Sequence, residues 1–188
     1  PAQARQVYLF KASLKRRKGL WRRIALQGQH TLDQFDFELR DAFDHDMGDH
    51  LSGFWKLVRR GKGRRFREVD LGDINPFEST ATGGTPIASL DLSPGDRLKY
   101  VYDFGDWIEH EIELEAIQEP QDDVDYPRLV EQNKPRYRYC RHCKEQGRKT
   151  VATWICHECT HKERTEVLVC EDCLVEYHET HYADKILY

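Results

Sequence analysis

The sequence of 188 residues predicts an α+β fold, a mostly antiparallel sheet packed on one main helix, plus a small C-terminal module. Three observations carry this prediction. Residues 7–15 alternate between apolar and polar side chains, which is typical of a half-buried strand. Residues 32–43 repeat apolar side chains at helical spacing. All six cysteines follow position 139. We therefore expect an N-terminal domain over 1–119, a linker over 120–139 and a separate module over 140–188.

The first strands and the helix have the clearest patterns. The strand Val7–Lys15 carries Tyr8, Phe10, Ala12 and Leu14 on one face. A basic turn leads into a second short strand, Trp21–Leu26. Thr31, followed three residues later by Gln34, forms a capping box that begins a helix. One face of that helix holds Leu32, Phe35, Leu39, Ala42 and Phe43.

The next segments read as strands joined by glycine-containing turns. His50–Val58 is predicted to be a strand and Phe66–Leu71 its return strand. Residues 72–96 contain Asn-Pro, Gly-Gly and Ser-Pro-Gly-Asp, so we expect mostly loop. A β-hairpin follows at 97–119. We expect a three-residue loop, Gly105–Trp107, which would place Tyr102 opposite His110 and keep the apolar side chains on one face.

Composition and charge narrow the classes of protein to which this chain can belong. Hydrophobic residues make up 39% of the chain and charged residues 33%, with a formal net charge of −4. There is no run of about 18 apolar residues, so no membrane span is expected. The N-terminus lacks the apolar region of a signal peptide. Clustered cysteines are typical of metal ligation in a reducing cytoplasm rather than of a disulfide scaffold.

The cysteines form three Cys-x-x-Cys pairs, and a histidine pair of the same spacing follows. The gaps between successive pairs are 12, 10 and 4 residues. Zinc takes four sulfur or nitrogen ligands in a tetrahedron, and a Cys-x-x-Cys turn supplies two thiolates at once. Eight ligands make two closed sites without an open position for water, which indicates a structural role. The predicted zinc ligands are Cys140, Cys143, Cys156, Cys159, Cys170, Cys173, His178 and His181.

Two pairings of these ligands are open. In a cross-brace, the first and third pairs bind one ion and the second and fourth bind the other. This order is similar to ZZ-type and B-box-type zinc modules, and it is the pairing we favour. In the sequential alternative, neighbouring pairs share an ion. His142, His157 and His161 are expected to lie on the surface.

The N-terminal domain resembles the plasmid pRiA4b ORF-3-like family over about residues 7–119. The resemblance is carried by Leu20–Ile24, by the helix after Thr31, by His50-Leu51-x-x-Phe54, and above all by the block Tyr100–His110. It implies an α+β fold and an occurrence in bacteria and archaea near plasmids and mobile elements. It supplies no established activity and no catalytic residues.

Histidines and carboxylates near the hairpin suggest a pocket. His50, Asp103, Asp106 and His110, with His45, Asp46 and Asp49 nearby, could bind a metal ion or move protons. The structural alternative is that the histidines are hydrogen-bonded at the edge of the core and that the aspartates cap the turn.

Two tracts, 15–23 and 59–67, each hold six basic residues in nine and could grip phosphates, with Trp21 and Phe66 available for stacking. The alternative is that they are solvated turns, or that they contact the acidic region 103–125 of this or another chain. The candidate nucleic-acid-binding residues are Lys15, Arg16, Arg17, Lys18, Arg22, Arg23, Arg59, Arg60, Lys62, Arg64, Arg65 and Arg67.

These observations lead to one expected function and two alternatives. We expect a non-enzymatic adaptor whose zinc module binds a protein partner. The first alternative is a nucleic-acid-binding accessory factor linked to mobile elements. The second is an enzyme with a His/Asp site near Asp103, Asp106 and His110. The sequence indicates no membrane partner and does not define the oligomeric state.

Overall fold

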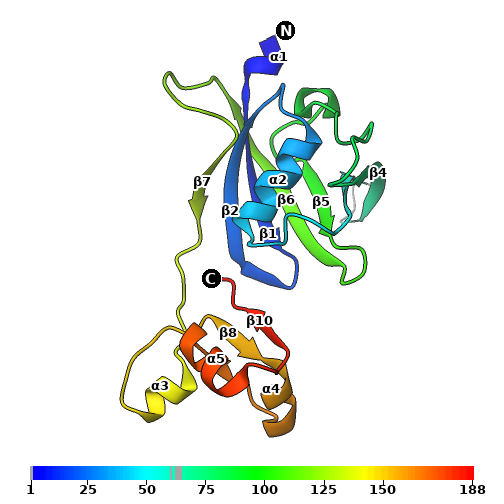
Figure 1. The fold of residues 1–188 in the computed structure, drawn as a ribbon. Helices are drawn as coiled ribbons and strands as arrows, with labels where there is room; N and C mark the ends of the chain where they lie inside the picture. Colours follow the sequence, from blue (N-terminus) through cyan, green and yellow to red (C-terminus); the bar gives the residue numbers. More distant parts are fainter. Residues whose placement is uncertain (1, 60, 62–64) are drawn as a thin grey trace. The chain divides into compact units, whose positions relative to one another are not determined.

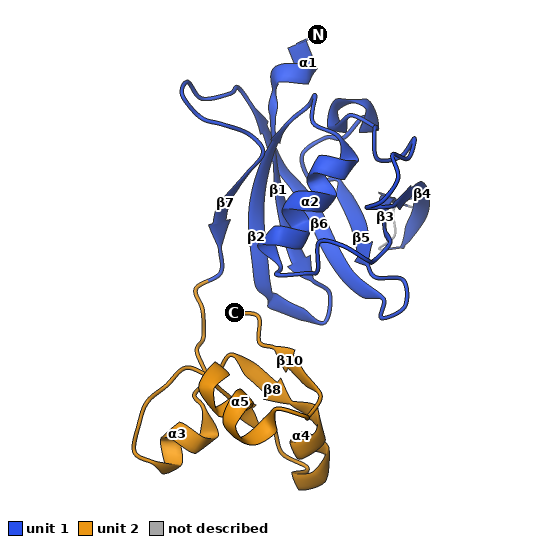
Figure 2. Cartoon of the chain, in the orientation of Figure 1, with its two compact units in different colours: residues 1–133 blue, residues 134–188 orange. Residues whose placement is uncertain are grey.

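The computed structural model describes residues 2–59, 61 and 65–188. The chain, whose fold is shown in Figure 1, divides into two compact units, residues 1–133 and 134–188, which have different colours in Figure 2. Among the described residues, no helix is both long and apolar enough to cross a bilayer. Each unit is described below by itself.

Unit 1 is built on one seven-stranded antiparallel sheet with the order β4-β3-β5-β6-β1-β2-β7. One main helix, α2 (Leu32–Ala42), lies against it (Figure 1), so the predicted α+β class is confirmed. A short helix, α1 (Ala2–Arg5), precedes the sheet, and a 3-10 turn, η1 (Ile87–Leu90), lies in the long loop before β5. The strands are β1 (Val7–Leu14), β2 (Arg17–Gln27), β3 (Ser52–Arg59), β4 (Phe66–Ile74), β5 (Arg97–Tyr102), β6 (Ile108–Gln118) and β7 (Arg128–Gln132).

The core of unit 1 forms where the apolar face of the sheet meets α2. Phe10, Phe35 and Phe54 are fully buried and their rings are in contact, with Phe10–Phe35 centroids 4.8 Å apart. Burying such aromatic side chains supplies much of the stability of a small domain. The helix begins as predicted, because the Gln34 side chain accepts a hydrogen bond from the Thr31 backbone N–H (3.0 Å).

The predicted hairpin is present, but its register is wrong by two residues. Tyr102 pairs with Ile108, and Tyr100 pairs with His110. The loop is therefore five residues long. Asp103 holds it: its carboxylate accepts a hydrogen bond from the Gly105 N–H (2.8 Å). A shift of two keeps every side chain on its face, so the predicted apolar face is preserved.

The segment expected to be a linker, 120–139, contains a strand. β7 (128–132) pairs with β2 and forms the edge of the sheet. The compact N-terminal unit accordingly extends to Asn133, whose side chain accepts hydrogen bonds from the Trp21 N–H (3.0 Å) and from Arg22 (2.6 Å).

Unit 2 has three short helices around a small three-stranded sheet of order β10-β8-β9. Its buried cluster consists of cysteines with Val167 and Val169, and Trp154 packs against it. Its elements are α3 (Arg141–Glu145), β8 (Trp154–Cys156), α4 (His157–Glu163), β9 (Leu168–Val169), α5 (Glu171–His178) and β10 (Ala183–Lys185).

Candidate metal centres and other predicted sites

The first cysteine of each Cys-x-x-Cys pair occupies a helix N-cap. Cys140, Cys156 and Cys170 immediately precede α3, α4 and α5, and the second cysteine of each pair lies in the first turn. Backbone N–H groups at a helix N-terminus point outward and carry partial positive charge, which stabilises a thiolate. The spacing thus places two sulfurs together at the positive end of one short helix.

The first metal-binding set is Cys140, Cys143, Cys170 and Cys173. All four are buried, and their sulfurs lie within 4.8 Å of one another. The Cys143 sulfur is 3.8 Å from those of Cys170 and Cys173. A tetrahedron with metal–sulfur bonds of about 2.3 Å has edges of about 3.8 Å. A disulfide would require about 2.05 Å, and all six cysteines are free thiols.

The second set is Cys156, Cys159, His178 and His181. Both histidines present Nδ1. The Nδ1 of His178 lies 3.4 Å from the Cys159 sulfur and 3.2 Å from the Nδ1 of His181. For bonds of about 2.3 Å to sulfur and about 2.05 Å to nitrogen, tetrahedral edges are about 3.5 Å and 3.3 Å respectively. The residues present therefore fit a tetrahedral metal ion at both sets.

This grouping joins the first cysteine pair to the third, and the second pair to the histidines. It is the cross-brace that the sequence favours, and the sequential pairing is not observed. Along the chain, Cys156 and Cys159 of the second set lie between the two cysteine pairs of the first set. Cys170 and Cys173 of the first set lie between the cysteine pair and the histidine pair of the second. The two halves of unit 2 are therefore interlocked.

The ordinary pKa values of the thiols are altered by their surroundings. Burial raises the pKa of Cys170 and Cys173, whereas hydrogen bonding with Thr150 lowers that of Cys143 to about 7. A divalent ion would hold all four as thiolates, and binding it would release protons.

One of the three spare histidines, His142, contacts a predicted metal ligand. The Nε2 of His142 lies 2.9 Å from the Nε2 of His178, whose Nδ1 faces the second set. If His178 binds a metal ion through Nδ1, its Nε2 carries the proton and donates a hydrogen bond to the Nε2 of His142. His142 is half-buried against Tyr177, so the surface position predicted for it is only partly correct. His157 contacts Asp184, and His161 is exposed.

The predicted pocket of unit 1 separates into two pairs, and one histidine of each, His45 and His50, contacts the ring of Tyr102. His50 Nδ1 lies 3.1 Å from an Asp103 oxygen. His110 is fully buried, and its Nε2 faces the Nε2 of His45 at 3.0 Å. Asp106 is exposed in the hairpin loop. Among the described residues, no carboxylate is paired with His110, and its Nδ1 has no hydrogen-bond partner.

Burial keeps this histidine pair neutral. It lowers the pKa of His45 to about 4, with Arg40 adding to the effect, and the pKa of His110 to about 3, with His45 adding. Two imidazoles that resist protonation within an aromatic core match the structural alternative of hydrogen-bonded core histidines.

The two basic tracts lie at opposite ends of the strands. The first surrounds the β1–β2 turn, and the described basic residues of the second, Arg59, Arg65 and Arg67, lie at the end of β3 and around the start of β4. β1 and β3 run in opposite directions within the sheet order, with β5 and β6 between them. The described residues of the two basic tracts therefore do not form one continuous positive face. Arg60, Lys62 and Arg64 lie outside the described residues.

The first tract is largely neutralised by carboxylates of β6. Lys15 pairs with Glu109 (2.7 Å), Lys18 with Glu111 (3.2 Å) and Arg23 with Glu115 (2.6 Å). Arg22 is buried and donates to the Ala42 carbonyl. Arg16 and Arg17 are exposed, as are Arg59, Arg65 and Arg67 of the second tract. The contact between tract 15–23 and the acidic region is thus intramolecular.

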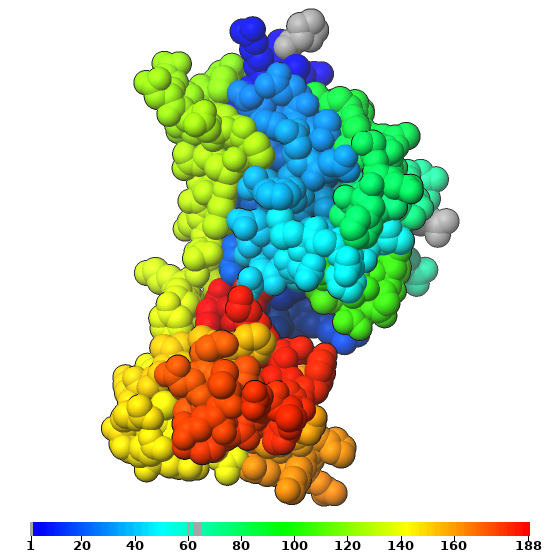
Figure 3. Space-filling view, in the orientation of Figure 1, coloured from blue at the N-terminus to red at the C-terminus, as the bar shows by residue number. Residues whose placement is uncertain are grey.

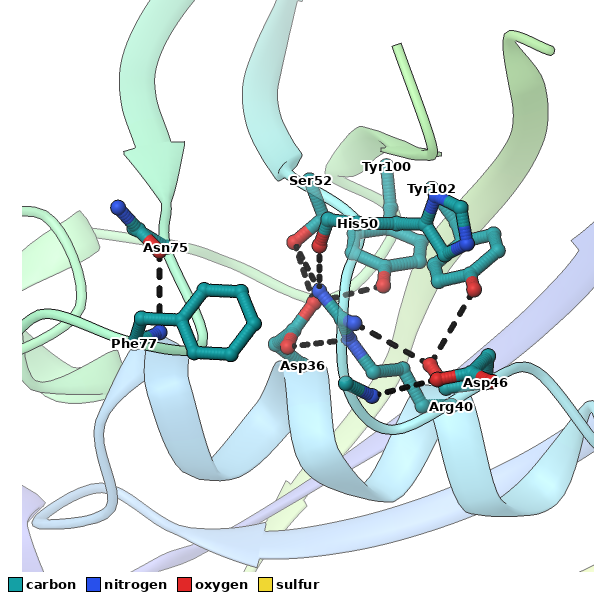
Figure 4. Close-up of polar contacts among 10 residues, drawn as sticks. Asp36, Arg40, Asp46, His50, Ser52, Asn75, Phe77, Tyr100 and Tyr102 are labelled. Atoms are coloured by element: carbon teal, nitrogen blue, oxygen red, sulfur yellow. Dashed lines mark hydrogen bonds and ion pairs between the residues drawn. The ribbon is translucent and has the colours of Figure 1, made fainter. Parts of the chain in front are cut away.

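Sequence reasoning missed a buried polar network on α2 (Figure 4). Asp36 accepts hydrogen bonds from Arg40 Nε (2.8 Å), from the Ser52 hydroxyl and from the Tyr100 hydroxyl (2.6 Å). Arg40 also donates to the His50 carbonyl (2.8 Å). Burial, followed by the Asp36 charge, raises the pKa of Tyr100 well above its usual value, so it donates as a neutral phenol. The available signal was an Asp/Arg pair at i, i+4 inside the apolar stripe of the helix.

Fold and sites together define a two-unit protein: an α+β sheet domain and a small module with two metal-binding sets. The chain belongs to the plasmid pRiA4b ORF-3-like protein family, whose sequence model matches residues 6–141. The match extends past the predicted limit of 119, through β7. It ends at the first cysteine pair, so most of unit 2 lies outside it.

One solved structure similar in fold is a protein of unknown function, MM3350, from Methanosarcina mazei Go1. The two sequences are 23% identical, the match covers 68% of each chain, and the TM-score is 0.51. At this identity the likeness supports the fold alone. None of the curated proteins matches this sequence.

Proposed function

We propose that this protein is a non-enzymatic adaptor in which two structural zinc ions hold a module that binds a protein partner. The observation that carries the proposal is the saturation of both sets. Four protein donors surround each tetrahedral position, which leaves no coordination site for water or substrate. The metal therefore supports a fold, and any activity of unit 2 belongs to its surface.

Zinc is the ion that suits these donors best. A four-thiolate set and a two-thiolate, two-imidazole set are both tetrahedral zinc environments, whereas calcium and magnesium require oxygen donors. Zinc has no redox chemistry of its own, in keeping with a structural role.

The surface of α5 supports a protein partner with a basic, partly apolar segment. Asp172, Val175, Glu176 and Glu179 follow at i, i+3, i+4 and i+7 and are exposed, Val175 by 59%. The other side of the helix carries Cys173 and His178 into the metal sets. Within the described part of the chain, none of the three carboxylates forms an ion pair. An acidic face with an apolar centre complements lysine or arginine side chains beside an aliphatic one.

The two alternatives gain less support from the geometry. An enzyme at the predicted pocket would need a carboxylate beside His110, which instead faces His45. A nucleic-acid-binding face would need the two basic tracts on one surface, and they lie at opposite ends of the strands.

The experiment compares capture of partners by three versions of the full chain. The first is unaltered, the second carries Asp172→Asn, Glu176→Gln and Glu179→Gln, and the third is a control with the same change in charge on the β6–β7 loop, Glu119→Gln, Asp122→Asn and Asp125→Asn. Zinc is quantified by native mass spectrometry, with two ions per chain expected in each version.

Support requires a captured protein that rebinds when purified, survives nuclease treatment, and is lost with the α5 variant and with chelation but not with the control. Capture that the α5 variant retains in full, or that nuclease abolishes, would overturn the proposed protein partner. A zinc content other than two would overturn the metal assignment.

A further inference from the structure

A cavity of about 330 Å³ opens beside α2 in unit 1, away from every site the sequence suggested. One wall is a stripe of the helix, with Asp33, Asp36, Phe37 and Arg40 at i, i+3, i+4 and i+7. The opposite wall is the segment 74–79 that follows β4. Its volume lies at the lower end of the range for ligand pockets, about 300–1,000 Å³. Figure 3 shows α2 and the 72–96 segment side by side at the surface of unit 1.

The rim of this cavity is aromatic and exposed. Phe77 is 70% exposed and Phe37 58%. Phe77 is held by its turn rather than by packing, because its N–H donates to the Asn75 side chain (3.0 Å) and Pro76 restricts the backbone between them. Figure 4 shows the Phe77 ring reaching from the loop towards the Asp36 side of the network. Large exposed apolar side chains gathered at a cavity mouth mark a binding surface.

The lining carries an excess of negative charge. Asp33, Asp36 and Glu78 face a single base, Arg40. Arg40 is 2% exposed, and its guanidinium is engaged by Asp36 and by backbone carbonyls, so it is not free to receive an anion. Asp33 and Glu78 form no ion pair within the described part of the chain. Burial, and then the charge of Asp36, raises the pKa of Asp33, as expected for a partly buried carboxylate near another carboxylate.

A glycine fixes the position of one of these carboxylates. A Cβ atom at Gly83 would lie 1.9 Å from an Asp33 oxygen, so only glycine leaves room for this carboxylate. The Asp33 N–H also donates to the Gly83 carbonyl (3.0 Å). The carboxylate is therefore held against the loop at the edge of the cavity.

We propose that this pocket binds the ammonium or guanidinium group of an organic cation with an apolar stem. The carboxylates of Asp33 and Glu78 supply the countercharge, since that of Asp36 is already paired with Arg40, and the rings of Phe37 and Phe77 supply the apolar and cation–π contacts. A lysine or arginine side chain of a protein and a free polyamine share this chemistry. The proposal concerns unit 1 alone and does not depend on the zinc module.

The test is a titration of the full, zinc-loaded chain followed by backbone amide NMR. The probes are n-butylammonium, its neutral counterpart n-pentanol, and its anionic counterpart pentanoate. Saturable shifts are expected at residues 33–40 and 74–79 with n-butylammonium, at an affinity at least fivefold tighter than with n-pentanol. Nα-acetyl-lysine-N-methylamide and spermidine, titrated in parallel, identify by their order of affinity whether a side chain or a polyamine is the better ligand.

Single-residue variants distinguish binding at this cavity from general electrostatic attraction of cations to an acidic protein. Asp33→Asn preserves shape and should weaken n-butylammonium binding at least fivefold, and Phe77→Ala should weaken it similarly. Asp41→Asn removes the same charge from the same helix outside the cavity and should leave affinity within twofold. Equal binding of n-pentanol, absence of saturation with every cation, or an equal loss with Asp41→Asn would each overturn the proposal.

Discussion

Removing the metal should unfold the whole of unit 2 and leave unit 1 intact. The ligands of the two sets interleave along the chain, because Cys156 and Cys159 lie between the two halves of the first set, and Cys170 and Cys173 lie between the two halves of the second. Releasing either ion frees a segment that the other ion needs. We therefore expect no stable half-module.

The expected loss of stability is large because few buried apolar side chains other than the cysteines stabilise unit 2. Apart from cysteines, its buried apolar side chains are Ala152, Val167 and Val169. Fully burying a valine contributes about 1.5–3 kcal/mol, so the two valines supply about 3–6 kcal/mol. A structural zinc ion contributes on the order of 10–16 kcal/mol. The loss of one ion thus exceeds both the valine contribution and much of the usual range of stability for a domain, about 5–15 kcal/mol.

The assay is a pair of amide NMR spectra, with and without a strong chelator, on the full chain. Amides of 134–188 should collapse to random-coil positions while those of 2–59 and 65–133 keep their dispersion. Cys173→Ser, which breaks the first set, and His181→Ala, which breaks the second, should each give the same collapse. His161→Ala removes an exposed histidine outside both sets and should change nothing.

Two results would refute this reasoning. One is a dispersed spectrum for 134–188 after both ions have been removed, which would show that the unit folds without metal. The other is collapse of only half of the unit in either single-set variant, which would show that the sites are sequential rather than interlocked.

Three further predictions concern groups around the sites. His142→Ala should weaken zinc binding at the second set by about 10- to 100-fold in a chelator competition, because it removes the hydrogen-bond partner of a ligand imidazole; an unchanged affinity would contradict this. Arg40→Met should destabilise unit 1 by about 3–5 kcal/mol in urea unfolding, because it strands the buried Asp36 carboxylate; an effect below 1 kcal/mol would contradict a buried pair. His45 and His110 have folded-state pKa values of about 4 and about 3, below the ordinary 6.5, so the unfolded state binds more protons between these limits. Stability is full above pH 6.5 and falls as pH drops towards 4, by up to about 2 kcal/mol per histidine at pH 5. Urea unfolding at pH 7 and pH 5, followed through unit 1 amides, measures this, and equal stability at both would contradict it.

The parts of the fold that were predicted correctly depend on local patterns. The alternation of β1 and the capping box and apolar stripe of α2 can be read within about a dozen residues, because burial on one face imposes the period. The metal ligands are equally local, since each cysteine pair is one turn at a helix N-cap and the histidine pair is one turn at the end of α5. The family match then agrees with the block Tyr100–His110 that carried the resemblance.

The two errors in the predicted fold, the hairpin register and the missed strand β7, arose because the side-chain pattern does not distinguish between alternative structures. A hairpin shifted by two residues keeps the same faces, so the side-chain pattern does not distinguish the two registers. The turn decides between them, through Asp103, which adopts a positive φ of 54° and binds the loop backbone with its carboxylate. β7 was missed because all five of its residues are exposed, so backbone pairing to β2 defines it without an apolar signal.

The sequence was also an incomplete guide to which residues form a site. Asp36 and Arg40 lie in the buried stripe of α2 and read in sequence as exceptions to it, yet they form the floor of the cavity beside that helix. Four residues are conspicuous in sequence, His50, Asp103, Asp106 and His110, yet they divide between a His50–Asp103 contact, an exposed turn and a buried neutral pair. Residue type alone indicates possible chemistry, whereas access and partners decide it.

The two proposals assign binding to different units and can fail separately. Each metal set has four protein donors, and the Asp36–Arg40 network satisfies its own hydrogen bonds. Among the described residues, Asp172, Glu176 and Glu179 in unit 2, and Asp33 and Glu78 at the cavity of unit 1, are carboxylates that form no ion pair. A chelated chain provides the decisive comparison, because it should lose the protein partner with unit 2 and keep cation binding in unit 1. Loss of both on chelation would mean that the cavity depends on the zinc module and that the independence argued for the two units is wrong.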